Sequence, residues 1–436
     1  MSKTTDAALV SVFRDEWPQL IGAAMRLVGD LQSAEDVVQE TLLTAVDKWP
    51  LQGVPDNPGA WLMTACRNRA RNVVRDSGRA RQRLSSMRPA DDWQPPEPEP
   101  GAIADDRLRL IVLCCHPQLT ADAQVALTLR MVSGLTTEEI ARAFQLPAAT
   151  IAQRIVRAKR LLKENRASFL DQDGDIGGRL PAILDVIYLA FNEGYLATSG
   201  ETLNRGDLAA EAHRLACLLT DLLPGEPDAW ALRALLSFQL SRWATRTDED
   251  GGIRTLDAQD RGQWNGELIR DGVWALGRAR DGERGPLVLQ AELASCHATA
   301  AAFEETDWAA IVALYDELTA IQDTPIVRMN RAVAIAMLAG PEAGLAALNP
   351  LTSDPVLRGS HRIWAVRADL HRRIADNAAA IADYDKAIEL VTNDAERRYL
   401  QAARHSLAQE TDMPTFRASL PELIARISSW ACTRTT

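Results

Sequence analysis

The stretch "TTEEIARAFQLPAATIAQRIVRAKR", residues 136–160, predicts two short helices joined by a tight turn. Thr136 and Glu139 have the spacing of a capping box, in which the two side chains satisfy the free backbone donors of a first helical turn. Pro147 follows the break at "QL" and suits the first position of a second helix, because its missing N–H loses no hydrogen bond there. The stretch therefore predicts a helix-turn-helix.

The second of these helices has two different faces. Its apolar stripe consists of residues that recur at helical spacing: Ile151, Ile155, Ala158 and Leu162. The opposite face is polar and basic, and it carries Thr150, Gln153, Arg154, Arg157 and Arg160. Arg and Gln pair bidentately with guanine and adenine in the major groove, where such a helix lies. An ordinary helical hairpin with a solvated Arg face is the alternative, and the cap, the proline, the spacing and the charge together favour DNA binding.

The net charge of −11 is unevenly distributed along the 436 residues. Residues 1–174 contain 22 Lys and Arg and 22 Asp and Glu, so the whole acidic excess lies after residue 174. Residues 67–88 hold eight arginines and one acid, Asp76, and a second basic run covers residues 142–166. A Pro-rich acidic segment between the two runs is typical of an extended linker. The chain therefore offers two basic modules to a polyanion despite its overall charge, since attraction to phosphate is local.

A further helix is predicted over residues 33–49, "SAEDVVQETLLTAVDKW", where Ser33 and Asp36 form a capping signal. Residues at helical spacing predict its buried face: Ala34, Val37, Val38, Leu42, Ala45 and Val46. The opposite face carries Asp36, Gln39, Glu40 and Leu43. In an isolated helix this face would be an ordinary solvated surface.

The order of three motifs gives that face another interpretation. "AEDVVQET", then "AWLMTACRNRARN" at residues 60–72, then the helix-turn-helix together resemble the extracytoplasmic-function (ECF) group of bacterial RNA polymerase sigma factors. The resemblance covers roughly residues 6–165. It implies a first module at 6–88 that binds core polymerase and the −10 promoter element, a linker at 89–106, and a second module at 107–170 that binds the −35 element.

The resemblance also implies roles for particular residues. The polymerase clamp helices would be faced by Asp36, Gln39, Glu40 and Leu43. The −10 element would be faced by Trp61, Arg67, Asn68 and Arg71. Because Trp49 and Trp61 are the aromatic residues near that surface, we expect the loop "PLQGVPDNPGA" to capture unstacked bases. The −35 element would be faced by Thr150, Gln153, Arg154 and Arg157.

Residues 176–436 have no counterpart in a minimal factor of this group. "AAIVALYDEL", "GLAALNPL" and "AAIADYDKAIEL" begin 35 residues apart, at 309, 344 and 379, which is typical of tetratricopeptide-like helical hairpins. In the last unit the repeat positions are Trp364, Ala368, Ala380, Tyr384 and Ala387. "YLAFNEGY" and "QDRGQWN" look like segments of the ECF subgroup that carries such an extension. That subgroup implies a regulatory extension, and helical stacks of this kind offer surfaces to protein partners.

We expect an all-α protein: two small helical modules, a flexible linker and a helical-repeat domain. The absence of a signal peptide and of a long apolar run predicts a cytoplasmic location. The six cysteines form no CxxC pair, and no glycine-rich phosphate loop or nucleophile motif occurs, so no catalytic residue, metal or cofactor is expected. His213 and His297 are interpreted as core residues. The alternative function is a tetratricopeptide scaffold or a DNA-binding regulator that does not join RNA polymerase.

Overall fold

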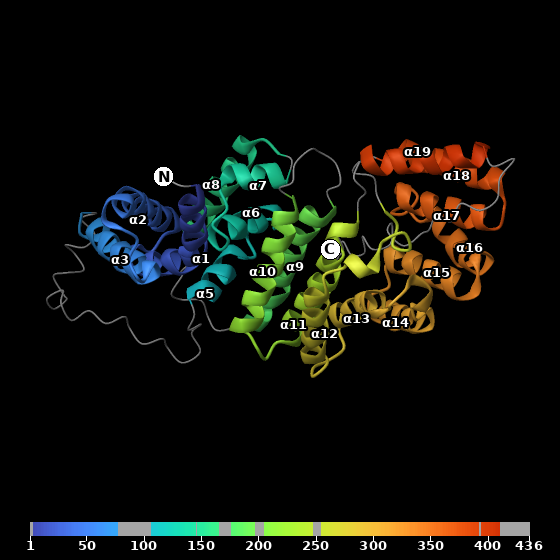
Figure 1. Cartoon of the computed structure of the whole chain (residues 1–436), viewed down its shortest axis with the longest axis horizontal. Coiled ribbons are helices and arrows are strands. Elements are labelled where there is room, and N and C mark those ends of the chain that lie inside the picture. Colours follow the sequence, from blue (N-terminus) through green and yellow to red (C-terminus); the bar gives the residue numbers. More distant parts are fainter. Residues whose placement is uncertain are drawn as a thin grey trace. The chain divides into compact units, whose positions relative to one another are not determined.

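The computed structural model describes residues 3–76, 106–144, 146–164, 176–196, 205–246, 254–391 and 394–409. Within these ranges every regular element is a helix (Figure 1). Contacts divide the chain into two compact units, Met1–Ala190 and Phe191–Thr436. The predicted linker, apart from Asp106, lies outside the described residues.

The first unit begins with three long helices. They are α1 (Lys3–Val28), α2 (Leu31–Gln52) and α3 (Pro58–Asp76), and each packs against the other two. Apolar side chains from all three are fully buried between them, among them Leu20, Val38 and Leu62. Gly53 ends α2 with a positive φ of 86°, a conformation that glycine adopts without steric cost.

Five further helices complete the first unit or leave it. They are α5 (Asp106–Cys114), α6 (Ala121–Met131), α7 (Thr137–Ala143), α8 (Ala148–Glu164) and the first part of α9 (Ile176–Leu196). α5 packs on both α1 and α6, and α8 packs on α6 and α7. Gly134, with a φ of 67°, lets the chain turn directly over the ring of Trp17, since a Cβ there would lie 3.0 Å from a ring carbon. A larger residue at Gly134 would push the two modules apart.

The second unit is built from the end of α9 and from paired helices. Its further helices are α10 (Arg205–Leu222), α11 (Pro227–Ser241), α12 (Gly266–Ala279), α13 (Pro286–Thr299), α14 (Trp308–Ile321), α15 (Pro325–Ala339), α16 (Pro341–Leu348), α17 (His361–Arg373), α18 (Asn377–Leu390) and α19 (Asp394–Gln409). Successive helices from α13 onward pack on one another.

The predicted repeat corresponds to the hairpins of this unit (Figure 1). Ala368, Ala380 and Ala387 are fully buried and Tyr384 nearly so, so that α17 and α18 approach closely, as the repeat pattern predicts. The middle repeat departs from the pattern: α16 has eight residues and continues as a 3-10 turn, Asn349–Ser353. The helix at "GLAALNPL" is therefore shorter than the corresponding helices of the repeats on either side of it.

None of the described helices combines the length and the apolar character needed to cross a membrane.

Candidate nucleic-acid interface

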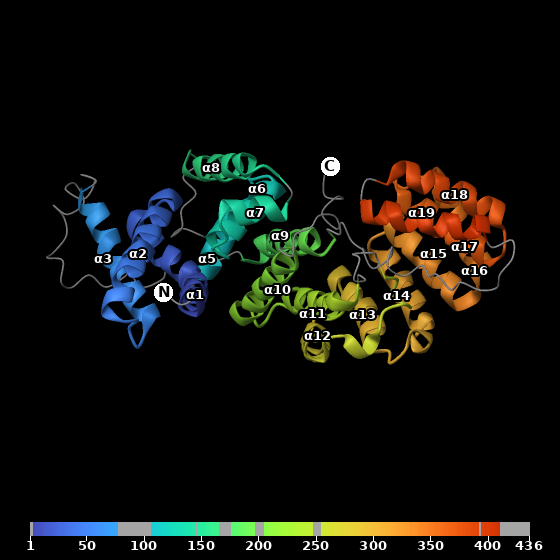
Figure 2. The same cartoon turned by 45° about the horizontal axis from the view of Figure 1, so that its top comes forward.

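The helix-turn-helix forms as the sequence predicts (Figure 2). The Thr136 backbone N donates to Glu139 Oε2 at 2.7 Å, and the Glu139 backbone N donates to Thr136 Oγ1 at 3.1 Å, so the capping box is confirmed. Pro147 lies one residue before α8 rather than inside it, and its carbonyl accepts a hydrogen bond from the Thr150 N–H at 2.9 Å. The buried residues of α8 are those of the predicted stripe, Ile151, Ile155, Ala158 and Leu162.

The opposite face of α8 carries the residues predicted to read DNA. Gln153 and Arg157 are exposed, and Thr150 is partly exposed. Arg154 forms an ion pair of 3.1 Å with Asp122 of α6, which the sequence did not indicate. Arg154 must therefore exchange a carboxylate for a base or phosphate if it contacts DNA.

The face of α3 predicted for the −10 element is also solvent-exposed. Arg67, Asn68 and Arg71 are exposed, and the spacing of three and four residues places them on one side of the helix. Trp61 is half-buried, with its ring 5.5 Å from that of Trp49 in an edge-to-face contact. Trp61 is thus partly in contact with the core of the module and partly accessible to solvent. The arginines at 79, 81, 83 and 88 lie outside the described residues.

The outward face of α2 is as predicted, whereas the beginning of the helix is not. Asp36, Gln39, Glu40 and Leu43 are all exposed, Leu43 by 62%. The helix begins at Leu31, because Asp30 rather than Ser33 is its N-cap and accepts hydrogen bonds from the backbone N and the hydroxyl of Ser33.

Val46, predicted to be buried, is 44% exposed, and the prediction was therefore wrong. The reason is its position: Val46 follows Leu43 by three residues and so falls on the same outward side of α2. The two side chains make an apolar strip next to the acidic residues. Glu40 itself pairs with Arg69 of α3.

A buried charge cluster links the two modules of the first unit. Glu35 of α2 forms ion pairs with Arg130 of α6 and with Lys159 of α8, and both the acid and the lysine are almost fully buried. Arg26 and Asp106 form a third pair at 2.7 Å between α1 and α5. Sequence reasoning missed all three pairs, because their partners lie 80 to 124 residues apart and no periodic pattern relates them.

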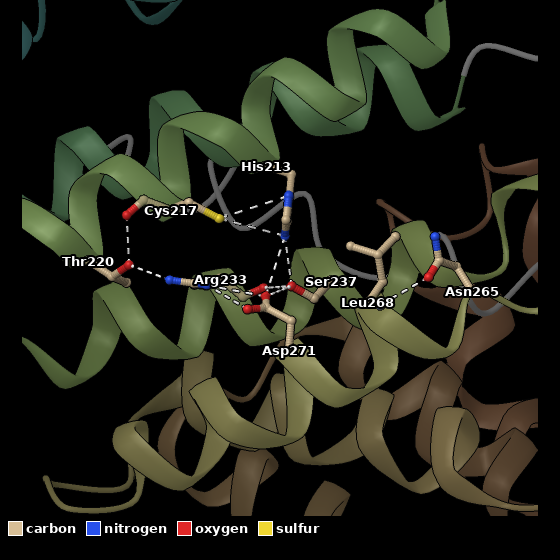
Figure 3. Close-up of polar contacts among 8 residues, drawn as sticks. All are labelled: His213, Cys217, Thr220, Arg233, Ser237, Asn265, Leu268 and Asp271. Atoms are coloured by element: carbon tan, nitrogen blue, oxygen red, sulfur yellow. Dashed lines mark hydrogen bonds and ion pairs between the residues drawn. The ribbon is translucent and has the colours of Figure 1, made fainter.

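The second unit holds a network of charged and polar side chains (Figure 3). Three of them, His213, Cys217 and Asp271, are residue types that bind metals, and their ligand atoms lie within 4.8 Å of one another. His213 and Cys217 of α10 lie close to Asp271 of α12, and Ser237 of α11 lies 2.8 Å from His213 Nε2 and 2.7 Å from Asp271 Oδ2. Arg233 donates to both oxygens of Asp271, at 2.5 and 3.2 Å. His213, interpreted from the sequence as a core residue, is in fact part of this partly buried network.

The protonation of the network favours an ion pair over a metal centre. Burial alone would lower the pKa of His213, but its hydrogen bonds to Asp271 and Cys217 raise that pKa to about 9. Although desolvation acts in the opposite direction, His213, Arg233 and Ser237 hold the pKa of Asp271 well below its usual range. A protonated imidazole has no lone pair for a metal, and a guanidinium already occupies the carboxylate. The network therefore ties α10, α11 and α12 together.

Comparison with family models identifies three regions of the chain. Residues 12–80 match sigma-70 region 2, and residues 109–162 match sigma-70 region 4. Residues 179–280 match a family of unknown function, DUF6596. The first two regions contain α2, α3 and the helix-turn-helix, which carry the faces described above.

Similar proteins include one that matches nearly the whole chain and others that match about a third of it. A protein of Rhizobium meliloti (strain 1021), named as uncharacterized, is 38% identical over 93% of this chain and 96% of its own length. The ECF RNA polymerase sigma factor SigL of Mycobacterium tuberculosis is 31% identical over 36% of this chain and 89% of its own length.

The RNA polymerase sigma-H factor of Pseudomonas aeruginosa is 31% identical over 32% of this chain and 77% of its own length. No solved structure matches the chain. Each of the two named sigma factors matches about a third of this chain, and the sigma-70 family models match residues 12–80 and 109–162, which hold α2, α3 and the capped helix-turn-helix. The chain therefore belongs to the extracytoplasmic-function family of RNA polymerase sigma factors, a family of transcription factors rather than enzymes.

Proposed function

We propose that this sigma factor docks on core RNA polymerase through the outward face of α2, contacts the −10 element through α3 and reads the −35 element through α8. The observation that carries the proposal is that arginines on α3 and α8 are exposed and have no acidic partner among the described residues. Among the described residues, Arg67, Arg71 and Arg157 are exposed and form no ion pair with an acid. Unpaired guanidinium groups on one helix face are available to phosphates and base edges.

The α2 face has the chemistry of a protein interface. Leu43 and Val46 form an exposed apolar strip, and Asp36, Gln39 and Glu40 flank it. An apolar centre with a polar rim is the usual composition of a specific protein contact. We assign this face to the polymerase and the basic faces of α3 and α8 to DNA.

Engagement of both promoter elements requires the two modules to separate. At about 3.4 Å per base pair, the roughly 25 base pairs between the −10 and −35 elements span about 85 Å. In the structure Lys159 of α8 is bonded to Glu35 of α2, so the two modules are in direct contact. We infer that the Glu35 cluster is broken when α3 and α8 occupy their two elements.

The helical second unit, in this proposal, regulates the first. The Rhizobium relative spans both units over 96% of its length, so the same combination of sigma regions and extension occurs in another organism. The acidic excess of the chain lies after residue 174, and this disfavours binding of the extension to DNA. A protein or peptide partner of the helical hairpins is one way in which such regulation could be delivered, because stacked hairpins bind peptides on their surfaces.

Genome-wide run-off transcription tests the proposal. Fragmented genomic DNA is transcribed by core polymerase alone, with the full chain, and with a chain ending at residue 196, which keeps α9 complete. We expect the full chain, the shortened chain or both to start transcripts at sites that share two sequence elements. If neither does so, the chain is not a promoter-specificity factor. Equal activity of the two chains under all conditions would remove the regulatory role of the second unit.

A substitution on α2 separates polymerase binding from DNA binding. Leu43→Asp places a charge in the apolar strip without altering a buried residue, and it should reduce core binding by at least tenfold. Lys48→Asn is the matched control, because Lys48 is exposed on the same helix and lies about 140° around its axis from Leu43, outside the predicted face. A Leu43→Asp chain that binds core polymerase normally would contradict the assignment of this face.

A further inference from the structure

The second unit encloses a cavity that neither the sigma regions nor the hairpin repeat explains. Its enclosed volume is about 70 Å³, and the open space inside it and above its mouth amounts to about 770 Å³. α11, α13, α14 and α15 form its walls, together with Trp264 from the segment before α12. Aromatic side chains supply much of the lining: Phe238, Trp264, Trp308 and Tyr315.

The cavity contains a buried positive charge. Arg242 lines it and is only 7% exposed, and no described carboxylate forms an ion pair with its guanidinium. Arg261, close by, has its pKa lowered by burial and then by the charge of Arg242, while Glu304 and Glu305 act in the opposite direction. Burying a cation without a partner costs desolvation free energy. An anion bound next to Arg242 would offset that cost.

Arg261 has a different role, which explains the sequence "QDRGQWN". Its Nη1 donates to the carbonyls of His297 and Ala300, both at 2.7 Å, and so closes the C-terminal end of α13. Its guanidinium also stacks 4.8 Å from the ring of Trp264. Arg261 therefore fixes the wall of the cavity and leaves Arg242 as the charge that faces the interior.

Two neutral polar groups of the cavity also lack partners. Asn330 is 2% exposed, and its Nδ2 has no hydrogen-bond partner within the described structure. The same holds for Nδ1 of His297. Burial and the charges of Arg242 and Arg261 lower the pKa of His297 to about 3, so its ring is neutral at pH 7. A neutral imidazole and an amide can both hydrogen-bond to a ligand beside a guanidinium.

We propose that this cavity binds a small organic carboxylate with an aromatic or other apolar body. The carboxylate pairs with Arg242, Asn330 and His297 supply hydrogen bonds, and the body packs against Trp264, Trp308 and Tyr315. A single guanidinium among mostly apolar walls suits one negative charge better than a phosphate dianion. Binding by itself does not depend on the proposed function. The further step, that the ligand is the signal to which the sigma factor responds, rests on it.

Thermal unfolding of the full chain tests the binding with benzoate, phenylacetate and indole-3-acetate, each at 10 mM. At least one of these carboxylates should raise the melting temperature of the second unit by about 2 to 4 °C, the shift for a ligand at roughly ten times its Kd. The matched amides, benzamide and indole-3-acetamide, should give little or no shift, and neither should inorganic phosphate. No response to any of the carboxylates would overturn the proposal. So would an equal response to the amides, or to phosphate.

Two variants and a control localise the effect. Arg242→Leu should abolish the shift, and without ligand it should melt at or above the temperature of the unaltered chain, because it removes a buried unpaired charge. Asn330→Leu should weaken binding about tenfold and leave folding intact. Arg270→Leu, an exposed position on α12, should retain the full response. A shift that survives Arg242→Leu, or a ligand-free Arg242→Leu chain that melts several degrees lower, would make Arg242 a structural residue instead.

A last variant examines acids of the chain itself. Asp248, Glu249 and Asp250 follow in the sequence and lie outside the described residues. The triple variant D248N/E249Q/D250N should respond to carboxylates as the unaltered chain does. If the triple variant responds to carboxylates and the unaltered chain does not, these acids neutralise Arg242 in the unaltered chain. The cavity of the unaltered chain is then not a carboxylate site. Because melting requires neither polymerase nor promoter, its outcome is separate from that of the transcription assay.

Discussion

The arginines of the two units have opposite surroundings. On α3 and α8 of the first unit, Arg67, Arg71 and Arg157 face solvent and have no acidic partner among the described residues. In the second unit, Arg233 is held by Asp271 between α11 and α12, and Arg372 is held by Asp369 on α17. These arginines of the first unit are thus free to bind an external anion, whereas those of the second unit stabilise its helices through ion pairs.

The difference separates a surface for an external polyanion from an interior stabilised by the chain's own acids. An exposed guanidinium is hydrated by water, so leaving it without an acidic partner costs little free energy. A buried guanidinium has lost that hydration and needs a carboxylate within the fold to offset the cost. Exceptions occur in both units. On α3 and α8, Arg69, Arg154 and Arg160 are paired with acids, and in the second unit Arg242 lacks a described partner although it is buried. The predictions below test the two classes and the pairing of Arg154.

The largest effect is expected from Asp271→Asn. Removing the carboxylate leaves Arg233 and His213 without their anion in a site that is mostly buried, which should lower local stability by about 2 to 4 kcal/mol. Hydrogen exchange of peptides covering α10–α12 measures this directly. Asp316→Asn, which removes a more exposed partner of Arg331, should cost less than about 1 kcal/mol. Similar losses for both variants would remove the distinction between buried and exposed arginine pairs.

The next effect concerns the first unit. Arg154→Ala should reduce discrimination between a good −35 element and a substituted one by about 1 to 3 kcal/mol, if Arg154 makes a bidentate base contact. Holoenzyme binding to the two promoters is the measurement. Lys163→Ala, at an exposed position of α8 about 120° around the helix axis from Arg157, serves as the control and should leave discrimination unchanged. A uniform loss of affinity for all DNA sequences would make Arg154 a phosphate contact.

The charge network of the second unit should also depend on pH. The pKa of His213 rises from 6.5 in the unfolded chain to about 9 in the fold. Its stabilising contribution is therefore complete below pH 6.5 and is lost as pH rises toward 9. Solvent screening reduces the contribution to about 1 to 2 kcal/mol. Exchange protection of α10 should fall over this interval in the unaltered chain and stay constant in His213→Gln; parallel curves would contradict a charged His213.

The smallest expected effect is a gain in DNA binding rather than a loss. Asp122→Asn releases Arg154 from its ion pair, in which the aspartate is largely exposed. Binding of −35 DNA should then improve by about two- to threefold, less than 1 kcal/mol, because exposed pairs contribute little. Fluorescence anisotropy of a labelled −35 duplex measures the change. A loss of affinity after this substitution would assign Asp122 a role in positioning Arg154 for DNA.

Local patterns in the sequence predicted the helix-turn-helix down to individual hydrogen bonds. A capping box and an apolar stripe are encoded within a few residues, so Thr136, Glu139 and the buried residues of α8 could be read directly. The beginning of α2 was misplaced by two residues, because Asp30 and Ser33 are both good capping residues and only their geometry decides between them.

Contacts between distant residues could not be predicted in this way. Glu35 pairs with Lys159 across 124 residues, and Arg242, His297 and Asn330 line one cavity only because four helices enclose it. His297, which lies beside Cys296 in the sequence, was interpreted as a core residue, and the structure adds that it lines that cavity. Such pairs depend on the packing of whole helices, for which a single sequence offers no local signal.

Footprinting on a promoter identified by run-off transcription tests the central claim most directly. We expect the chain together with core polymerase to protect the −10 and −35 elements at once, and the chain alone to protect neither at the same concentration. Arg67→Ala with Arg71→Ala should remove the −10 protection, and Arg157→Ala should weaken the −35 protection. Equal protection by the chain without polymerase would contradict the account and would identify a DNA-binding regulator that acts alone.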